Sequence, residues 1–212
     1  MSQVRNVVAK AVSHPRVFEM QTVLLGGRRA AAALLPVARR ATRGKVRGTV
    51  VDVGGGTASA RSLWPEGWDY IGVDPDRRVV EHDPTGGAIR RLVGDAAQLS
   101  LLDHSVDVVL MKNVSHHLDD AAWIGALAEA RRILKTDGCF VFVDAVWTRR
   151  RLPSRLAWAL DAGRFPRVPE KLEGAIESSF DVETRQHLTQ VHHSIMLTSR
   201  PLLLNGGPAG AA

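Results

Sequence analysis

Cysteine, tyrosine and long apolar runs are scarce in this sequence. Cys139 is the one cysteine among 212 residues, so a single chain can form neither an internal disulfide nor a cysteine metal cluster. Because no stretch of about 18 apolar residues occurs, we expect no transmembrane helix. The first residues lack the apolar segment and cleavage pattern of a secretory signal peptide. We therefore expect a protein of a reducing compartment, the cytoplasm.

Acidic residues are nearly missing from positions 1–47. This segment contains ten Lys or Arg residues and one acid, Glu19, so its formal charge is +9, whereas the other residues, 18 basic and 21 acidic, sum to −3. Such a segment attracts anionic partners, including acidic substrates, carrier proteins, membrane surfaces and nucleic acids. A solvated face of ordinary helices would have the same composition. The charge alone leaves both interpretations open.

The composition is that of a globular domain, with 45% hydrophobic and 24% charged residues. The length favours a single domain, which we place at 1–204. Within it we expect an N-terminal helical cap (1–47), a core (48–146), and a substrate-side insertion with an edge hairpin (147–204). The Gly- and Ala-rich residues 205–212 are expected to form a flexible tail.

The hydrophobic pattern predicts helices first and then an alternation of strands and helices. Helices are predicted at 3–13, 17–25 and 28–41. Strands are predicted at 49–53, 69–73, 89–93, 106–111 and 139–146, with helices at 57–63, near 76–82 and at 119–134. In the last helix, Ile124, Leu127, Ala128, Ile133 and Leu134 are expected to face the sheet. Alternating segments at 180–186 and 191–199 predict an antiparallel hairpin at the sheet edge.

This order of elements predicts an α/β fold with a doubly wound, Rossmann-like sheet of seven strands. Most strands should be parallel, the C-terminal hairpin antiparallel, and the N-terminal helices should form a lid. Ligands of such sheets bind outside the carboxyl ends of the strands.

A glycine-rich turn follows the first predicted strand, in the stretch VVDVGGGTASA at 50–60. Glycine lets the backbone approach a ligand and adopt positive φ. Asp74 lies at the end of the second strand, 22 residues after Asp52. An acid at about this spacing typically hydrogen-bonds ribose hydroxyls, in nicotinamide enzymes as well as in others. Helix capping and turn formation are the structural alternatives for such acids.

Five motifs in order resemble those of the class I S-adenosylmethionine-dependent methyltransferases, in their small-molecule, type 11-like form. They are VDVGGGTA (51–58), GVDPD (72–76), GDAAQL (94–99), DHSVDVVLMKNVSHHLDD (103–120) and ARRILKTDGCFVFVD (130–144). The resemblance covers residues 49–146.

The resemblance implies that S-adenosylmethionine binds here, with S-adenosylhomocysteine as the product. Asp74 would bind the ribose, and Asp95 would accept a hydrogen bond from the adenine amino group. Asp52 would orient the loop and help to hold the ammonium group. The implied binding residues are Asp52, Gly54, Gly55, Gly56, Asp74, Pro75, Asp95, Ala96 and Asn113. Ala58 stands where the family has a third glycine, and we expect binding to survive this change.

The acceptor side is predicted from polar and aromatic residues near the ends of the fourth and fifth strands. The candidates for a general base are His116, His117 and Asp144, although histidines at this position also serve packing. The candidates for substrate binding are Phe18, Trp147, Arg164 and Arg167. The histidines lack convincing metal-ligand partners, so we expect no metal.

These features favour methyl transfer to the oxygen or nitrogen of a small molecule, in bacterial secondary or lipid metabolism. A nucleic-acid (RNA) methyltransferase is an alternative that the basic N-terminus suggests. The fourth strand, however, ends in MKNVSHH and lacks the Pro-Pro-aromatic motif used around a flipped base. A non-catalytic protein that binds S-adenosylmethionine is a further alternative. The sequence leaves a monomer and a homodimer open.

Overall fold

The computed structural model describes residues 27–82, 89–148, 152, 154, 158, 163–189 and 193–202. The helices predicted at 3–13 and 17–25, and with them the N-terminal lid and Phe18, lie outside these residues.

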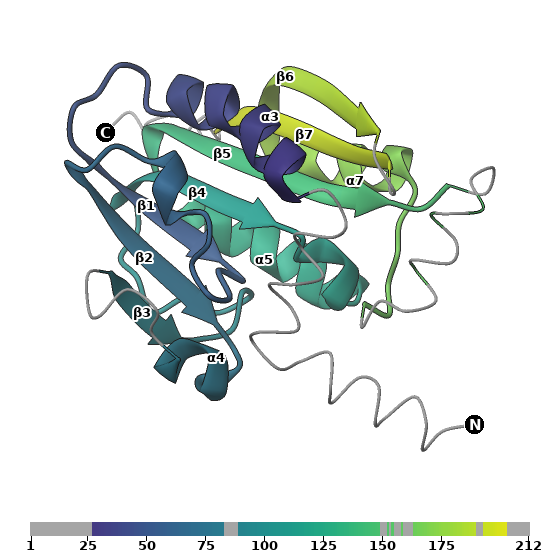
Figure 1. Ribbon diagram of the computed structural model, residues 1–212, viewed down its shortest axis with the longest axis horizontal. Coiled ribbons are helices and arrows are strands. Elements are labelled where there is room, and N and C mark those ends of the chain that lie inside the picture. Colours follow the sequence, from purple (N-terminus) through teal and green to yellow (C-terminus); the bar gives the residue numbers. More distant parts are fainter. Residues whose placement is uncertain are drawn as a thin grey trace, which may run out of the picture.

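A seven-stranded sheet forms the centre of the fold, with the strand order β3-β2-β1-β4-β5-β7-β6 (Figure 1). Its strands are β1 (Gly48–Val53), β2 (Trp68–Asp74), β3 (Arg90–Val93), β4 (Val106–Lys112), β5 (Leu134–Val146), β6 (Phe180–Thr189) and β7 (His193–Pro201). The first five strands are parallel, and β7 is antiparallel to both β5 and β6. The predicted α/β sheet with an antiparallel C-terminal hairpin is therefore confirmed.

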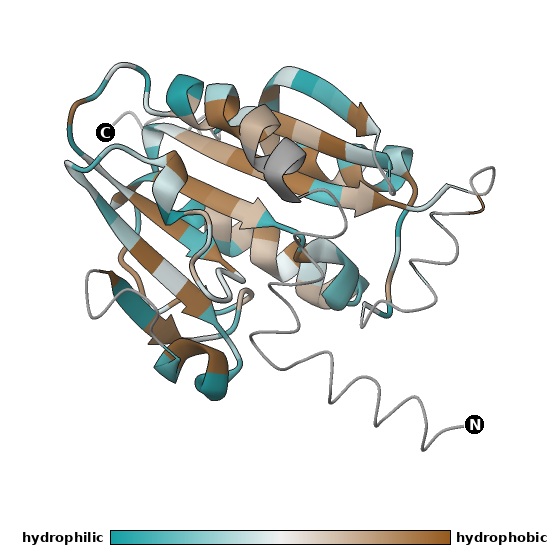
Figure 2. Cartoon of the chain, viewed as in Figure 1, coloured by the Kyte–Doolittle hydropathy of each residue, from teal (hydrophilic) through white to brown (hydrophobic). Residues whose placement is uncertain are grey.

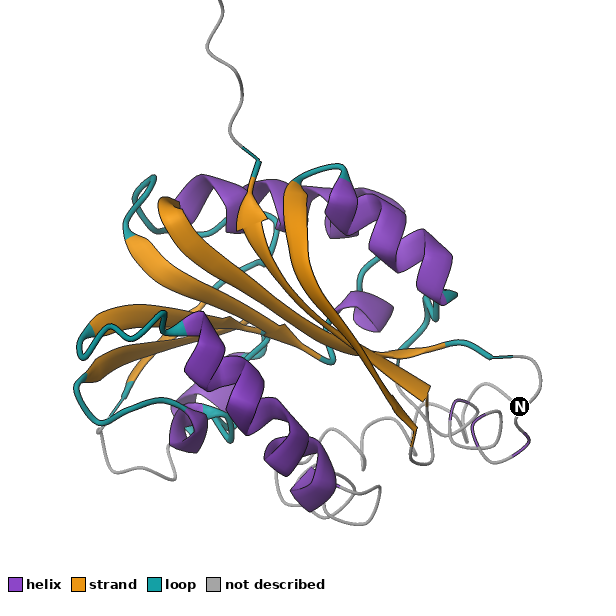
Figure 3. Ribbon diagram, turned by 90° about the horizontal axis from the view of Figure 1, so that it is seen from above, coloured by secondary structure: helices purple, strands orange, loops and turns teal. Residues whose placement is uncertain are grey.

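Helices cover both faces of this sheet (Figure 3). The α-helices are α3 (Gly27–Ala41), α4 (Arg77–Glu81), α5 (Asp120–Ile133) and α7 (Pro169–Glu177), and the short 3-10 helices are η1 (Arg61–Leu63) and η2 (Ser115–His117). Helices α5 and α7 pack with the core on one face, and α3 packs on the other. None of these helices is long and apolar enough to cross a membrane.

Hydrophobic residues are frequent along the central strands (Figure 2). Because successive side chains of a strand point to opposite faces, they build one core on each face of the sheet. On β1, Val51 and Val53 belong to the core under α5, whereas Val50 belongs to the core under α3. Helix α3 lies within the expected N-terminal cap, but its residues Leu34 and Ala38 are buried against the sheet. This helix is therefore part of the sheet packing.

The helix predicted at 57–63 is wrong, because the structure has turns there and only the three-residue η1. Ala58 has a φ of 60°, which is outside the right-handed helical region. Pro65 restricts the preceding Trp64 to extended backbone (φ −105°, ψ 147°), which stops η1. The alternation also fails between β3 and β4, where residues 94–105 form a loop without a helix.

The buried face of α5 is displaced from the predicted one. Ile124 is 53% exposed and Ala128 is also exposed, so both assignments were wrong. The buried residues of this helix are Trp123, Ala126, Leu127, Ala130 and Ile133, which recur at steps of three or four. Leu134 is buried as predicted, but it begins β5 rather than ending the helix.

Candidate functional site

The candidate site lies at the carboxyl ends of β1, β2, β4 and β5. These parallel strands are neighbours in the sheet, so the residues that follow them meet at one edge. The glycine-rich turn follows β1, Asp74 ends β2, Asn113 follows β4, and Asp144 lies near the end of β5. The fold thus brings most of the predicted site residues to one place.

The glycine-rich turn uses left-handed backbone at Gly54 (φ 70°) and Gly56 (φ 52°). The Gly54 amide donates to the Val73 carbonyl over 2.7 Å, which ties the turn to β2. A Cβ atom added to Gly54 would lie 2.4 Å from Cγ2 of Val114. Glycine is therefore needed at this position for its conformation and for the close contact with the segment after β4.

Asp74 holds the turn with its carboxylate. One oxygen accepts from the Gly56 amide (3.1 Å), and the other accepts from the Asp76 amide (2.9 Å). Burial raises the pKa of Asp74, and these two amides partly offset the effect. Helix capping was the alternative role for Asp74. The N-cap of α4 is instead Asp76, whose carboxylate accepts from the Arg78 amide. Each oxygen of Asp74 has a further lone pair for a ligand hydroxyl.

The remaining predicted binding residues lie at the strand ends with little burial. Asp95 is exposed and accepts from the Ala97 amide over 2.9 Å, so it forms the turn that was its structural alternative. Pro75 is exposed after β2, and Ala96 is half-buried. Asn113 is exposed in left-handed backbone (φ 58°), and its amide donates to the Val143 carbonyl over 2.8 Å.

Asp52 lies beneath the turn and is only 1% exposed. Its carboxylate accepts a hydrogen bond from the hydroxyl of Tyr70 on β2. Burial raises the pKa of Asp52 to about 6, although the charge of Lys112 and the Tyr70 hydroxyl oppose this rise. Sequence analysis missed Tyr70, the only tyrosine of the chain. Its place four residues before Asp74, on a strand next to that of Asp52, was the available signal.

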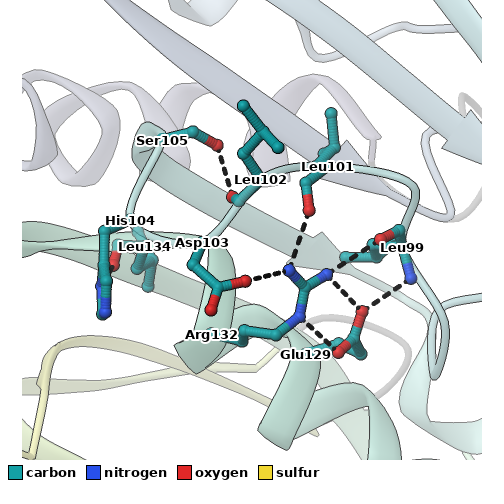
Figure 4. A network of polar contacts seen from close by, with 9 residues as sticks. All are labelled: Leu99, Leu101, Leu102, Asp103, His104, Ser105, Glu129, Arg132 and Leu134. Atoms are coloured by element: carbon teal, nitrogen blue, oxygen red, sulfur yellow. Dashed lines mark hydrogen bonds and ion pairs between the residues drawn. The ribbon is translucent and has the colours of Figure 1, made fainter.

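Two arginines that the sequence analysis also missed bind loops of the sheet, Arg91 at the glycine-rich turn and Arg132 at the loop that leads into the start of β4. Arg91 on β3 donates to the Gly56 carbonyl of the turn and to the Val79 carbonyl. Arg132 on α5 holds the loop after Asp95 (Figure 4). The acceptors of its hydrogen bonds are the Leu99 and Leu101 carbonyls and the Asp103 and Glu129 carboxylates.

Asp144 is completely buried and is surrounded by donors. It accepts from the Ser115 amide (2.8 Å), the Ser115 hydroxyl (2.6 Å) and Nδ1 of His116 (2.7 Å). Burial alone would raise the pKa of Asp144, but the His116 charge and these hydrogen bonds outweigh it and hold the pKa below its ordinary value. An ionised carboxylate enclosed in this way does not reach a ligand. The structure therefore corrects the base role considered for Asp144, which is instead the partner that orients His116.

Aromatic rings gather around His116. The ring of the exposed His117 lies 4.2 Å from that of His116, centroid to centroid, and the Trp158 ring meets His116 edge-on at 5.4 Å. Trp147, a predicted substrate residue, lies 6.5 Å from Trp158 and is half-buried. Two of the three candidate bases thus lie in an aromatic surrounding next to the ends of β4 and β5.

Arg167 is not available for substrate binding, contrary to our prediction. Its side chain is 3% exposed, and its guanidinium donates to the Ser115, Leu118 and Phe165 carbonyls and to Asp120. A buried guanidinium with these partners has no donor left for a substrate. Arg164, by contrast, is exposed in the loop before α7, so its role in substrate binding stays a prediction.

Part of the basic N-terminal segment serves the fold. Arg43 pairs with Glu183 over 3.0 Å, and Lys45 pairs with Asp107 and Asp137, each over 2.9 Å. The alternative of an ordinary charged surface therefore applies to these two residues.

Replacing Ala58 by valine is expected to destabilise the fold by about 2–3 kcal/mol. A β-branched side chain is strained at φ 60°, and the buried site must also accept two further methyl groups. Urea unfolding measures the change. Ser59→Val is the matched control, because Ser59 is exposed and the same change there should stay within about 0.5 kcal/mol. Equal effects at both positions would contradict the left-handed geometry of Ala58.

Comparison with known proteins relates part of the chain to a family. The family described as "Methyltransferase domain" matches residues 51–142. An uncharacterized methyltransferase of Mycobacterium sp. (strain JLS) is 37% identical over 101 residues, which are 47% of this chain and 39% of that protein. The chain spans less than half of the length of this relative.

Solved structures share the fold. The PH0226 protein of Pyrococcus horikoshii OT3 has a TM-score of 0.70 at 20% identity, covering 82% of this chain and 91% of that chain. A TehB-like SAM-dependent methyltransferase of Corynebacterium glutamicum has a TM-score of 0.63 at 21% identity, covering 90% and 99%. Residues 51–142 thus match the methyltransferase domain family, and the chain shares its fold with solved S-adenosylmethionine-dependent methyltransferases.

Proposed function

We propose that this protein transfers a methyl group from S-adenosylmethionine to a small molecule. The observation that carries the proposal is the meeting, at one sheet edge, of the glycine-rich turn, Asp74 and the His116–Asp144 pair. The first two are suited to the cofactor, and the pair is suited to an acceptor that must lose a proton.

The residues at the strand ends fit the cofactor. Asp74 is an oriented carboxylate whose oxygens each accept only one protein amide, so it suits the two hydroxyls of a ribose. Asp95 is exposed at the neighbouring turn, where it suits a donor such as an exocyclic amino group. Gly54, Gly55, Gly56 and Asn113 offer backbone groups, and when bound S-adenosylmethionine supplies a methyl group on a positively charged sulfur.

His116 is the residue that we assign as general base. Its Nδ1–H donates to the ionised Asp144, so in the neutral ring Nε2 carries the lone pair that takes a proton. Such a base helps most when the acceptor is a hydroxyl, because an oxygen nucleophile must be deprotonated. We assign His117, Trp147 and Arg164 to the walls of the acceptor site, and methyl transfer mainly requires that acceptor and donor are held in line.

Arg43 and Lys45 of the basic N-terminal segment already pair with acidic side chains. These two cations are therefore less available for the phosphates of RNA, which favours a small acceptor. The relative named above is bacterial. We place the reaction in bacterial secondary or lipid metabolism, as the resemblance to small-molecule members suggests.

The test uses S-adenosylmethionine with a labelled methyl group and fractions extracted from the source organism. Label is expected in small molecules, and transfer should require both the protein and an intact His116. Label only in RNA or protein would overturn the small-molecule acceptor. S-adenosylhomocysteine binding without any labelled product would favour the non-catalytic alternative, and absence of binding would overturn the cofactor assignment.

Binding of S-adenosylhomocysteine is expected to weaken as the pH falls through about 6, where Asp52 takes up a proton. If the ionised carboxylate is the binding form, affinity at pH 5 is about tenfold below that at pH 7. Because the folded pKa of Asp52 lies above the unfolded value, the free energy of unfolding should decrease as the pH rises from the ordinary pKa of 3.8 to about 6. Calorimetry between about pH 5 and 8 measures the change in affinity, and urea unfolding between about pH 4 and 7 measures the change in stability.

Two variants control this pH prediction. Asp52→Asn should remove both pH dependences. Tyr70→Phe removes a hydrogen bond that lowers the pKa of Asp52, so it should move the binding midpoint to higher pH. A midpoint near pH 6 that persists in Asp52→Asn would assign the titration to another group.

A further inference from the structure

Arg167 is the most completely bonded cation among the described residues at the site edge, and the proposed chemistry does not use it. Its five N–H groups all have acceptors. Nε and Nη2 donate to the Asp120 carboxylate (3.1 and 2.8 Å), and Nη2 also donates to the Leu118 carbonyl (2.8 Å). Nη1 donates to the Ser115 carbonyl (2.6 Å) and the Phe165 carbonyl (3.4 Å).

The acceptors of Arg167 lie on both sides of His116. Ser115 precedes it, Leu118 is the C-cap of the 3-10 helix η2 that contains it, and Asp120 begins α5. A three-residue 3-10 helix has few hydrogen bonds of its own. The Ser115 carbonyl accepts from the Leu118 amide over 3.2 Å. The guanidinium adds a second bond to this carbonyl and binds the Leu118 carbonyl as well, so it holds the backbone that carries the His116 ring.

The backbone around Arg167 adds two further ties. The Phe165 amide donates to the His116 carbonyl over 3.0 Å, and the Trp147 amide, just after β5, donates to the Arg167 carbonyl over 2.8 Å. Residues 165–167 therefore bridge the end of β5, where Asp144 lies, and η2, where His116 lies. The two partners of the pair are joined by this bridge as well as by their own hydrogen bond.

A planar guanidinium suits this role better than an ammonium group. It presents five donors in a fixed fork and can bind several carbonyls and a carboxylate at once. A buried cation is costly unless its donors are satisfied, and here all are. This role does not require the Arg167 side chain to contact a substrate.

We propose that Arg167 is the positioning residue of the acceptor site, which fixes the His116 ring against Asp144 by holding the carbonyls of Ser115 and Leu118. The proposal rests on the proposed function in one respect, the role of His116 as base. The coupling between Arg167 and His116 can be measured without knowing the acceptor.

The experiment compares Arg167→Met, Arg167→Lys and Lys171→Met by nuclear magnetic resonance of the imidazole nitrogens. Lys171→Met is the matched control, because Lys171 binds the same Asp120 carboxylate (2.7 Å) but contacts neither carbonyl. In the wild type we expect a slowly exchanging Nδ1–H signal for His116. In both Arg167 variants this proton should exchange at least about tenfold faster, and the ring should populate both tautomers. Lys171→Met should resemble the wild type.

Calorimetry with S-adenosylhomocysteine and a melting curve accompany each variant. Cofactor binding should change little in Arg167→Lys, since none of the residues assigned to the cofactor contacts Arg167. If Arg167→Met does not fold, Arg167→Lys decides, because it keeps the charge and loses only the fork. A folded Arg167→Lys with the His116 signals of the wild type would overturn the proposal, and so would equal changes in Lys171→Met. Failure of the proposed function would appear differently, as absence of methyl transfer by the wild type.

Discussion

Asp74→Ala is expected to weaken the binding of S-adenosylhomocysteine by about 100-fold or more. A hydrogen bond to a charged group contributes about 1.5–3 kcal/mol, so losing two ribose contacts removes about 3 kcal/mol or more. The carboxylate is already oriented by the Gly56 and Asp76 amides, so the ligand does not have to order it. Titration calorimetry at neutral pH measures the loss.

Part of the effect of Asp74→Ala comes from the turn itself. Without the carboxylate, the Gly56 amide loses its acceptor and the glycine-rich turn loses one of its ties to the end of β2, while the amides of Gly54 and Gly55 keep theirs to the Val73 carbonyl. Asp74→Asn separates the two contributions, because its amide oxygen still accepts one backbone hydrogen bond. We expect an intermediate loss of affinity for Asp74→Asn, about tenfold.

Asp76→Ala is the matched control for Asp74→Ala. Asp76 lies two residues further along and caps α4 through the Arg78 amide, and its side chain does not bond the turn. The change should cost about 1 kcal/mol of helix capping and leave the affinity close to that of the wild type. A loss of affinity that is as large in Asp76→Ala as in Asp74→Ala would show a general disturbance of β2 and α4.

Asp144→Ala is expected to lower the free energy of unfolding by about 3–5 kcal/mol. The change leaves three buried donors without their acceptor, the Nδ1–H of His116 and the amide and hydroxyl of Ser115. Each buried donor left unsatisfied costs about 1–3 kcal/mol. In a chain of this length that loss corresponds to a melting temperature lower by about 6–20 °C. Urea unfolding and calorimetric melting measure it.

The pH dependence of Asp144→Asn identifies the charge as the source. The folded pKa of Asp144 is held below its ordinary value, so its stabilising effect is present above the unfolded pKa and is lost as the pH falls through the folded pKa. The stability difference between wild type and Asp144→Asn should therefore shrink in acid. A stability difference that stays constant down to the lowest pH at which the protein folds would contradict the charge of Asp144 as its source.

Methyl transfer by Asp144→Asn should fall by about 100-fold or more, because the His116 ring is no longer held in one tautomer. Asp107→Asn is the matched control. Asp107 is also a buried aspartate, bound by Lys45, Lys135 and the Thr49 amide, but it lies near the start of β4. This variant should be destabilised and still transfer methyl groups once folded. A similar loss of activity in both variants would contradict a specific role of Asp144 in orienting His116.

The central strands β1 and β4 were predictable because each is a short, largely apolar run. Residues 49–53 and 106–111 were placed within one residue of β1 and β4. The absence of a helix at 57–63 was not predictable. It depends on the left-handed backbone of Ala58, and an alanine in a sequence does not indicate that conformation. The face of α5 was displaced because Ile124 is apolar and nevertheless points to solvent.

The site was predictable where its residues are close in sequence or follow a strand. Gly54, Gly56 and Asp74 have this character, because strand ends of a parallel sheet meet at one edge. Tyr70 and Arg91 were missed because their hydrogen-bond partners, Asp52 and Gly56, are distant in the sequence and come close only in the folded sheet. Arg167 was misassigned, since a sequence shows a charge but not whether that charge is buried.

By itself, the sequence determined the order of the elements along the chain, the glycine-rich turn and the acids near the ends of β1 and β2. These are local properties, set by hydrophobic period and backbone freedom. Only the tertiary structure decided that Asp144 and His116 are partners, that Asp52 is covered by Tyr70, and that Arg167 holds the backbone around His116. The physical reason is that burial and hydrogen-bond partnership arise between segments separated in the chain, and folding alone brings them within contact distance.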